Sequence, residues 1–163
     1  MRTGIHLSAD GLDVEKPESA LIAGDYKAEE KALYRPWLLR LIQEVSGVEG
    51  IGRIRLGSLE PRIITREFAA ELAKIPKLCT HFHLSLQSGC DATLKRMNRH
   101  YNTEEYRERC GILREAFDNP ALTTDVIVGF PGDTEEDIAA TRQSLEQVHF
   151  YEMHVSKYPR LRA

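Results

Sequence analysis

The stretch His81-Phe82-His83-Leu84-Ser85-Leu86-Gln87-Ser88-Gly89 alternates between polar and apolar side chains along its whole length. Successive side chains leave an extended backbone on opposite sides, so the alternation predicts a β-strand whose apolar face carries Phe82, Leu84 and Leu86. The other face carries His81, His83, Ser85 and Gln87. Buried polar groups without partners cost about 1–3 kcal/mol each. The polar face should therefore line a ligand-filled hollow or, in an antiparallel sheet, face solvent.

Extended segments recur along the chain, and most are followed by a loop and a helix. The predicted strands are residues 2–8, 53–57, 81–87, 124–129 and 150–158, and the predicted helices are 36–47, 65–75, 91–97, 103–117 and 134–148. Thr65, Thr103 and Thr134 stand where helix caps are expected. Repetition of strand, loop and helix predicts parallel strands joined by helical crossovers.

The strands present one apolar and one polar face, whereas a doubly wound sheet covered by helices on both sides would be apolar on both. The polar-face positions are His6, Arg55, His83, Ser85, Gln87, Asp125, Gly129 and His154. A curved sheet with helices outside and a polar lumen inside explains this asymmetry. Five strands are too few to close a barrel. The expected fold is α/β, an open partial (β/α) barrel or a fragment of a larger one.

The 163 residues suit one domain, and the formal charge of −3 gives no general attraction to nucleic acid. Residues 9–35 are expected to form a long loop, with or without a helical turn around residues 28–33, and disorder is favoured because they lack apolar periodicity. No apolar run is long enough to span a membrane and the start lacks a signal-peptide core, so we expect a cytoplasmic protein. Three widely spaced cysteines, Cys79, Cys90 and Cys110, suit reduced thiols.

Parallel barrels place their sites where strands end and loops begin. The loops in question are residues 57–61, 87–89 and 129–132, whose glycines allow backbone to approach a ligand closely. Ser85 and Gln87 are the strongest candidates, because a polar pair in a lumen needs a partner. Glu60 is explained equally well by solvation, and Gly132 is expected to serve the turn.

Three runs carry a family resemblance: Arg53 to Pro61, His83 to Arg99 and Thr124 to Gly132. They resemble the radical S-adenosylmethionine methylthiotransferases. Residues 3–8 and 54–61 are most similar to the branch that modifies N6-threonylcarbamoyladenosine next to the tRNA anticodon. The resemblance implies a partial (β/α)6 barrel that binds S-adenosylmethionine and a [4Fe–4S] cluster and installs a methylthio group at adenine C2.

The resemblance also implies a set of cofactor-binding residues, namely Gly4, Glu60, Ser85, Gln87, Arg99 and Gly129. Gly4 would lie near the methionine end of the cofactor. Ser85 and Gln87 would lie near its ribose or methionyl part. The arginine would bind the carboxylate, since a guanidinium can donate two parallel hydrogen bonds. Gly129 would allow the adenine to approach the backbone closely, and Glu60 would be a weaker contact. No catalytic residue and no metal ligand is assigned.

One departure from the family is large: the Cys-x3-Cys-x2-Cys loop that holds its cluster is absent. Radical chemistry requires three thiolates, so this polypeptide alone is expected to be inactive. We interpret it as a core fragment that runs from the second barrel strand to the sixth and lacks the first. Its parent would bind tRNA; the oligomeric state is left open.

Two alternatives remain. The first is a catalytically silent barrel fragment that binds S-adenosylmethionine or nucleic acid. Lys95, Arg96, Arg99 and His100 form a small basic patch, although a solvated helix end explains them better. The second is a metal-dependent hydrolase using His81-x-His83, because histidines two apart on a strand project to the same side.

Overall fold

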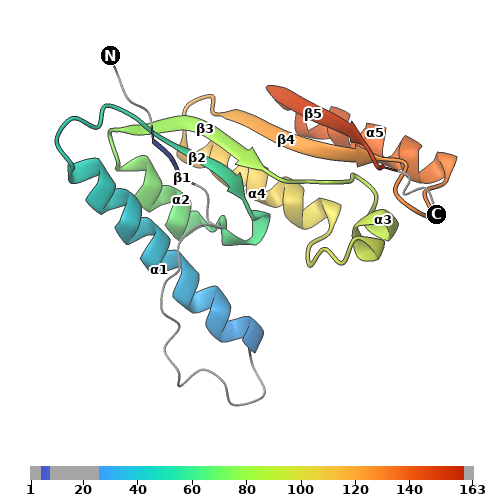
Figure 1. Ribbon diagram of the computed structural model, residues 1–163, viewed down its shortest axis with the longest axis horizontal. Coiled ribbons are helices and arrows are strands. Elements are labelled where there is room, and N and C mark those ends of the chain that lie inside the picture. Colours follow the sequence, from blue (N-terminus) through green and yellow to red (C-terminus); the bar gives the residue numbers. More distant parts are fainter. Residues whose placement is uncertain (1–4, 8–25, 160–163) are drawn as a thin grey trace.

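The computed structural model describes residues 5–7 and 26–159, with side chains described from Trp37 onward (Figure 1). In chain order the elements are β1 (Ile5–Leu7), α1 (Tyr26–Gly47), β2 (Ile54–Leu59), the 3-10 turn η3 (Pro61–Ile63), α2 (Arg66–Ala73), β3 (Leu78–Leu84), α3 (Asp91–Arg96), α4 (Thr103–Ala116), β4 (Ala121–Val128), α5 (Glu135–Val148) and β5 (Glu152–Lys157). None of the described helices is both long and apolar enough to cross a bilayer.

The five strands form one sheet in the order β1-β2-β3-β4-β5, and every neighbouring pair is parallel. Parallel crossovers are right-handed, so a strand order that never reverses brings all the crossover helices to one face of the sheet. Figure 1 shows α1, α2 and α4 beneath that face. The predicted partial (β/α) barrel is therefore confirmed over the doubly wound alternative. The helix-free side of the sheet is called the open face below.

The side chains of β3 divide between the two faces as the alternation predicts. Phe82, Leu84 and Leu86 are at most 2 % exposed and belong to the core between sheet and helices. The polar residues between them, His83 and Ser85, are partly exposed on the open face. The hydrophobic effect thus sets the orientation of the strand, since reversing it would expose three large apolar side chains.

Several boundaries differ from expectation; β4, for example, begins at Ala121 rather than Thr124. Helix α1 begins at Tyr26, so the loop predicted over residues 9–35 is wrong for residues 26–35, where the helical turn considered at residues 28–33 is part of a longer helix, and Pro36 is not at a first helical position. The stretch from Tyr26 to Arg35 is rich in Ala, Glu, Lys and Leu, whose helix propensity is high. Strand β3 begins at Leu78 rather than His81. Gly4 and residues 8–25 lie outside the described residues.

The helix caps follow the predicted chemistry at two of three positions. Thr65 and Thr134 accept hydrogen bonds from the amides of Phe68 and Asp137. The third cap is Asn102 rather than Thr103, because Asn102 forms a reciprocal pair of hydrogen bonds with the N3 residue of the helix.

Candidate cofactor site at the carboxyl ends of the strands

The end of β3 carries a bulge. His83 pairs with Thr123, and the next pair along the two strands is Gln87 with Val126. The two paired residues are four positions apart along the end of β3 and the segment after it but only three positions apart in β4. The extra residue lies in the segment from Leu84 to Leu86. Bulges re-aim side chains and are frequent beside functional sites. Here the bulge ends the regular strand just where the polar pair of Ser85 and Gln87 is presented.

Left-handed backbone occurs at the ends of three adjacent strands. The φ angles are 52° at Ser58 in β2, 69° at Gln87 after β3 and 72° at Gly129 after β4. Left-handed backbone is energetically unfavourable for serine and glutamine, and residues in this conformation cluster at active sites and ligand-binding sites. Gln87 is fixed from both sides, since its amide donates to Asp125 and its carbonyl accepts from Ile127.

A row of hydrogen-bonded polar side chains crosses the open face below these ends. His83 lies 3.0 Å from the hydroxyl of Thr123 through Nδ1 and 3.1 Å from the carboxylate of Asp125 through Nε2. Arg55 of β2 contacts both ring nitrogens of His81. Burial, and then the positive charge of Arg55, lowers the pKa of His81, so the neutral imidazole is favoured.

The two histidines do not form a metal site. A guanidinium beside His81 repels a metal ion, and His83 is committed to other partners. The described residues also contain no group of three His, Cys, Asp or Glu side chains arranged to hold a metal ion. The hydrolase alternative therefore has no ligand set in the described part of the chain.

Glu60 and Arg99 both lie within electrostatic reach of the Tyr101 hydroxyl. Burial raises the pKa of Tyr101 to about 12, with Arg99 lowering it and Glu60 raising it. The same hydroxyl donates to the carbonyl of Ser85 at 2.7 Å. Both charges therefore act on a hydroxyl that is hydrogen-bonded to the end of β3, although Glu60 and Arg99 come from different loops.

The roles of the two charged residues differ. The carboxylate of Glu60 caps η3 by accepting from the amide of Arg62, and it also pairs with the Arg62 guanidinium at 2.9 Å. This carboxylate is already engaged within its own loop, although each oxygen keeps a lone pair that can accept from a ligand. Arg99 is exposed, and no described carboxylate forms an ion pair with it, so it can meet an anion.

The glycines of the candidate loops serve different purposes. A Cβ added at Gly129 would meet no atom within 4 Å, so the space beside it is open to a ligand. At Gly132 a Cβ would lie 3.4 Å from Arg96, as suits a turn glycine with a φ of 86°. A Cβ at Gly89 would lie 2.8 Å from both Ser144 and the carbonyl of Thr141. Gly89 is therefore required by its close packing against α5, a reason for glycine that differs from the expected approach of a ligand.

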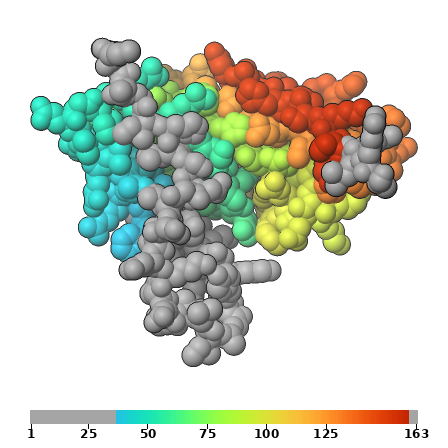
Figure 2. All heavy atoms as spheres, viewed as in Figure 1, coloured from blue at the N-terminus to red at the C-terminus, as the bar shows by residue number. Residues whose placement is uncertain are grey.

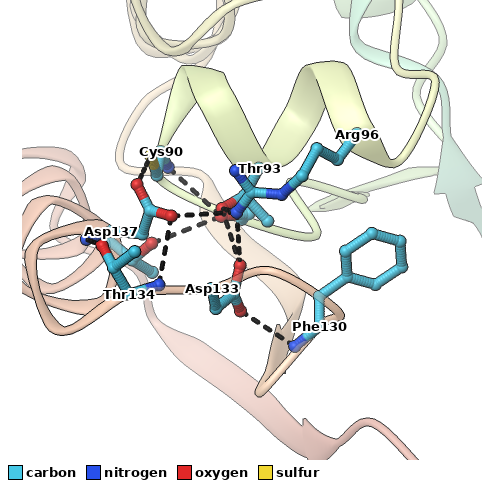
Figure 3. Close-up of polar contacts among 9 residues, drawn as sticks. Cys90, Thr93, Arg96, Phe130, Asp133, Thr134 and Asp137 are labelled. Atoms are coloured by element: carbon cyan, nitrogen blue, oxygen red, sulfur yellow. Dashed lines mark hydrogen bonds and ion pairs between the residues drawn. The ribbon is translucent and has the colours of Figure 1, made fainter.

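Figure 3 shows a network that joins the loop after β4 to α3. Arg96 donates at 2.9 Å to Thr93, Asp133 and Asp137. Asp133 also accepts from the hydroxyl of Thr93 and from the amide of Phe130, next to Gly129. The Arg96 charge is therefore neutralised by two carboxylates, which removes it from the basic patch suggested by the sequence.

This network gives a pH-dependent prediction. The Cys90 thiol, followed by Arg96, holds the pKa of Asp137 below its ordinary value of 3.8. A carboxylate with a lowered folded-state pKa stabilises the fold above the unfolded-state value, and this contribution is lost as pH falls through the folded-state value. We expect Arg96→Leu to melt at a lower temperature than the wild type at pH 7, with the gap narrowing below about pH 4.

The measurement is thermal unfolding followed by circular dichroism from pH 7 to pH 2.5. Arg107→Leu is the matched control, because its exposed pair with Glu104 should contribute little at any pH. A gap for Arg96→Leu that stays constant across this range would contradict the assignment.

The cysteines are dispersed. Cys79 in β3 is partly exposed, whereas Cys90 and Cys110 are buried. Cys90 donates to Asp137, and burial raises the pKa of Cys110 to about 12. In this chain they do not fit an iron–sulfur cluster, which requires thiolates converging on one point.

Thiol reactivity tests this arrangement. We expect brief alkylation at pH 8 to label Cys79 and to leave Cys110 unlabelled until the chain is unfolded, since only an exposed thiolate reacts readily. Peptide mass spectrometry reads out each site. Equal labelling rates at Cys79 and Cys110 would show that the thiol of α4 is not buried.

Two surface features do not coincide with the strand ends. A hollow of about 410 Å³ lies at the amino ends of β2 and β3 and is lined by residues such as Arg53, Lys77 and His81. We place the site at the carboxyl ends, because the bulge, the left-handed residues and the polar pair converge there. At the edge of the sheet, β5 is exposed along its whole length (Figure 2).

Comparison with known proteins agrees with this geometry. The family model described as the radical SAM superfamily matches residues 26–145. The chain belongs to the radical SAM superfamily. It is 42% identical over 120 residues to the tRNA-2-methylthio-N(6)-dimethylallyladenosine synthase of Akkermansia muciniphila, a match covering 74% of this chain and 26% of that protein. The enzyme of the same name from Desulfosudis oleivorans is 46% identical over 110 residues, covering 68% and 24%.

The chain spans about a quarter of the length of these curated relatives. The solved structure titled as coproporphyrinogen III oxidase (HemN) from Escherichia coli, a radical SAM enzyme, superposes with a TM-score of 0.64 at 19% identity, over 79% of this chain and 30% of that one. That likeness supports the barrel fold alone. The predicted resemblance to radical SAM methylthiotransferases is confirmed at family level, and membership of the family implies S-adenosylmethionine and a [4Fe–4S] cluster as its cofactors.

Proposed function

We propose that this chain is the S-adenosylmethionine-binding core of a tRNA methylthiotransferase. The observation that carries the proposal is Ser85 on the open face and the partly exposed Gln87 two residues later, beside left-handed backbone at the ends of β2, β3 and β4. A ligand seated there meets hydrogen-bonding groups from several strands, as parallel barrels require.

Each residue has a proposed role. Ser85 and Gln87 hydrogen-bond the ribose or methionyl part of the cofactor, and the exposed guanidinium of Arg99 binds its carboxylate. Gly129 leaves room for the adenine. Glu60 is a weaker contact because its carboxylate already caps η3. Gly4 keeps its proposed place near the methionine end.

The cofactor supplies the radical chemistry, and the chain orients it. The three cysteines of the sequence are dispersed over separate elements, so we propose that the cluster ligands lie in a segment outside this sequence. The full enzyme would act on tRNA in the cytoplasm. Without that segment, the chain behaves as the catalytically silent binding module considered above.

Isothermal titration calorimetry of the purified chain with S-adenosylmethionine tests the proposal. Binding is expected, with Ser85→Ala and Gln87→Ala each weakening it about tenfold, the loss of about 1.4 kcal/mol that one hydrogen bond explains. The control is Gln43→Ala, an exposed glutamine of α1, which should bind as the wild type does. Absence of wild-type binding, or equal affinity of Gln87→Ala and Gln43→Ala, would contradict the proposal.

For the substrate we propose N6-threonylcarbamoyladenosine in tRNA. Residues 3–8 and 54–61 resemble that branch, and the half-exposed carboxylate of Asp125 on the open face can accept a hydrogen bond from the hydroxyl of a threonylcarbamoyl substituent. A dimethylallyl group, the substituent named in the curated relatives, cannot use such bonds.

Binding of the two nucleosides in the presence of S-adenosylmethionine distinguishes these substrates. We expect the threonylcarbamoyl nucleoside to bind more tightly and Asp125→Ala to reduce the difference. Tighter binding of the dimethylallyl nucleoside would assign the chain to the other branch.

A further inference from the structure

Three buried hydroxyl groups converge on the bulge at the end of β3. Thr124, Tyr106 and Tyr101 are 0%, 1% and 6% exposed. The hydroxyl of Thr124 donates to the carbonyl of Leu84 at 2.6 Å and accepts from the amide of Leu86 at 2.9 Å. It thus bridges the two ends of the bulge from the neighbouring strand.

The tyrosines complete the set of contacts. Tyr106 of α4 donates to the carbonyl of Leu84 at 2.8 Å. Tyr101, just before α4, lies 2.7 Å from the carbonyl of Ser85 and 3.0 Å from that of Leu86. Three consecutive carbonyls of the bulge therefore accept from side-chain hydroxyls, which we call the hydroxyl cradle.

The cradle supplies hydrogen-bond partners to backbone groups that are not paired with β4. The ladder between β3 and β4 is regular up to His83 and resumes at Gln87, so backbone pairing with β4 does not hold the segment between them. Buried backbone polar groups must find partners, and a bulge supplied with side-chain partners keeps one conformation. In that conformation Leu84 and Leu86 enter the core, and Ser85 turns to the open face.

We propose that Thr124, Tyr106 and Tyr101 are positioning residues for S-adenosylmethionine, holding the bulge so that Ser85 and Gln87 face the cofactor. This inference rests on the proposed function. None of the three hydroxyls needs to touch the ligand, because each acts through the backbone that carries the binding side chains. Tyr101 also follows Arg99 by two residues in the chain, so one member of the cradle is close in sequence to another proposed cofactor contact.

The decisive variants alter single hydroxyls. Thr124→Val keeps the shape of the side chain and removes both of its bonds to the bulge, whereas Thr124→Ser keeps the hydroxyl and removes a methyl group. Calorimetry with S-adenosylmethionine should show affinity lowered about tenfold in the valine variant and restored to within about threefold of wild type in the serine variant. Tyr101→Phe should fall between them.

The control is Ile112→Val, a buried α4 residue at 4% exposure. It reduces packing without touching the bulge, so its affinity should match the wild type. Wild-type affinity in Thr124→Val would overturn the proposal. So would an equal loss of affinity in Thr124→Val and Thr124→Ser. Tyr101→Phe provides the same comparison if Thr124→Val fails to fold.

Amide hydrogen exchange separates failure of the cradle from failure of the proposed function. The Leu86 amide should exchange about tenfold faster in Thr124→Val than in Thr124→Ser, because only the valine removes its acceptor. If the wild type does not bind S-adenosylmethionine, the proposed function and the cradle's link to the cofactor both fail, and this exchange difference still reports whether the hydroxyls hold the bulge. Equal exchange in the two variants would overturn the cradle itself.

Discussion

Replacement of Phe82 by alanine is expected to lower the free energy of unfolding by about 3–5 kcal/mol. Phe82 is 0% exposed in β3, the central strand of the sheet, and its ring centroid lies 4.8 Å from that of Phe117. Truncation removes the apolar area that the helices cover and leaves a cavity in a core that cannot close around it.

Urea unfolding followed by circular dichroism measures this effect. Arg55→Ala is the matched control, because it truncates an exposed side chain on the opposite face of the neighbouring strand and should change stability by less than about 1 kcal/mol. Similar losses in the two variants would mean that β3 does not direct its apolar face toward the helices.

Gly89→Ala should cost about 2–3 kcal/mol through overpacking. The new Cβ would lie 2.8 Å from the Thr141 carbonyl and 2.9 Å from its Cα, and backbone of α5 cannot move aside as a flexible side chain would. The loop is also fixed by the Ser144 hydroxyl, which donates to the carbonyl of Gly89 at 2.8 Å.

Gly111→Ala provides a control of opposite sign. Gly111 lies within α4 with nothing within 4 Å of its added Cβ, so alanine should stabilise the helix by about 0.5–1 kcal/mol. Chemical unfolding of both variants gives the comparison. Unchanged stability in Gly89→Ala would show that the loop does not pack against α5.

The orientation of the central strand was predictable because it depends on a local pattern. Alternation places Phe82 and Leu84 on one side whatever the neighbouring strands are, and burial then selects that side. The parallel order followed from repeated strand, loop and helix. The start of α1 was not predictable from apolar periodicity, since residues 26–35 have high helix propensity without an apolar stripe.

The candidate site was predictable in its location and less so in its construction. Ser85 and Gln87 are candidates because of the polar face, but the bulge beside them depends on register with β4, which the sequence of a single strand does not show. Arg96 looked like part of a basic patch because its acidic partners, Asp133 and Asp137, lie 37 and 41 residues away along the chain. The hydroxyl cradle was missed for the same reason, since Thr124 and its carbonyl partner are 40 residues apart.

The most direct test of the account is an NMR titration of the isotopically labelled chain with S-adenosylmethionine, reading the backbone amides. We expect the largest shift changes at residues 57–60, 85–89 and 129–132, around the carboxyl ends of β2, β3 and β4. Changes centred instead on residues 52–53 and 77–81, at the hollow on the amino ends of the strands, would contradict the placement of the cofactor site on which the proposed function depends.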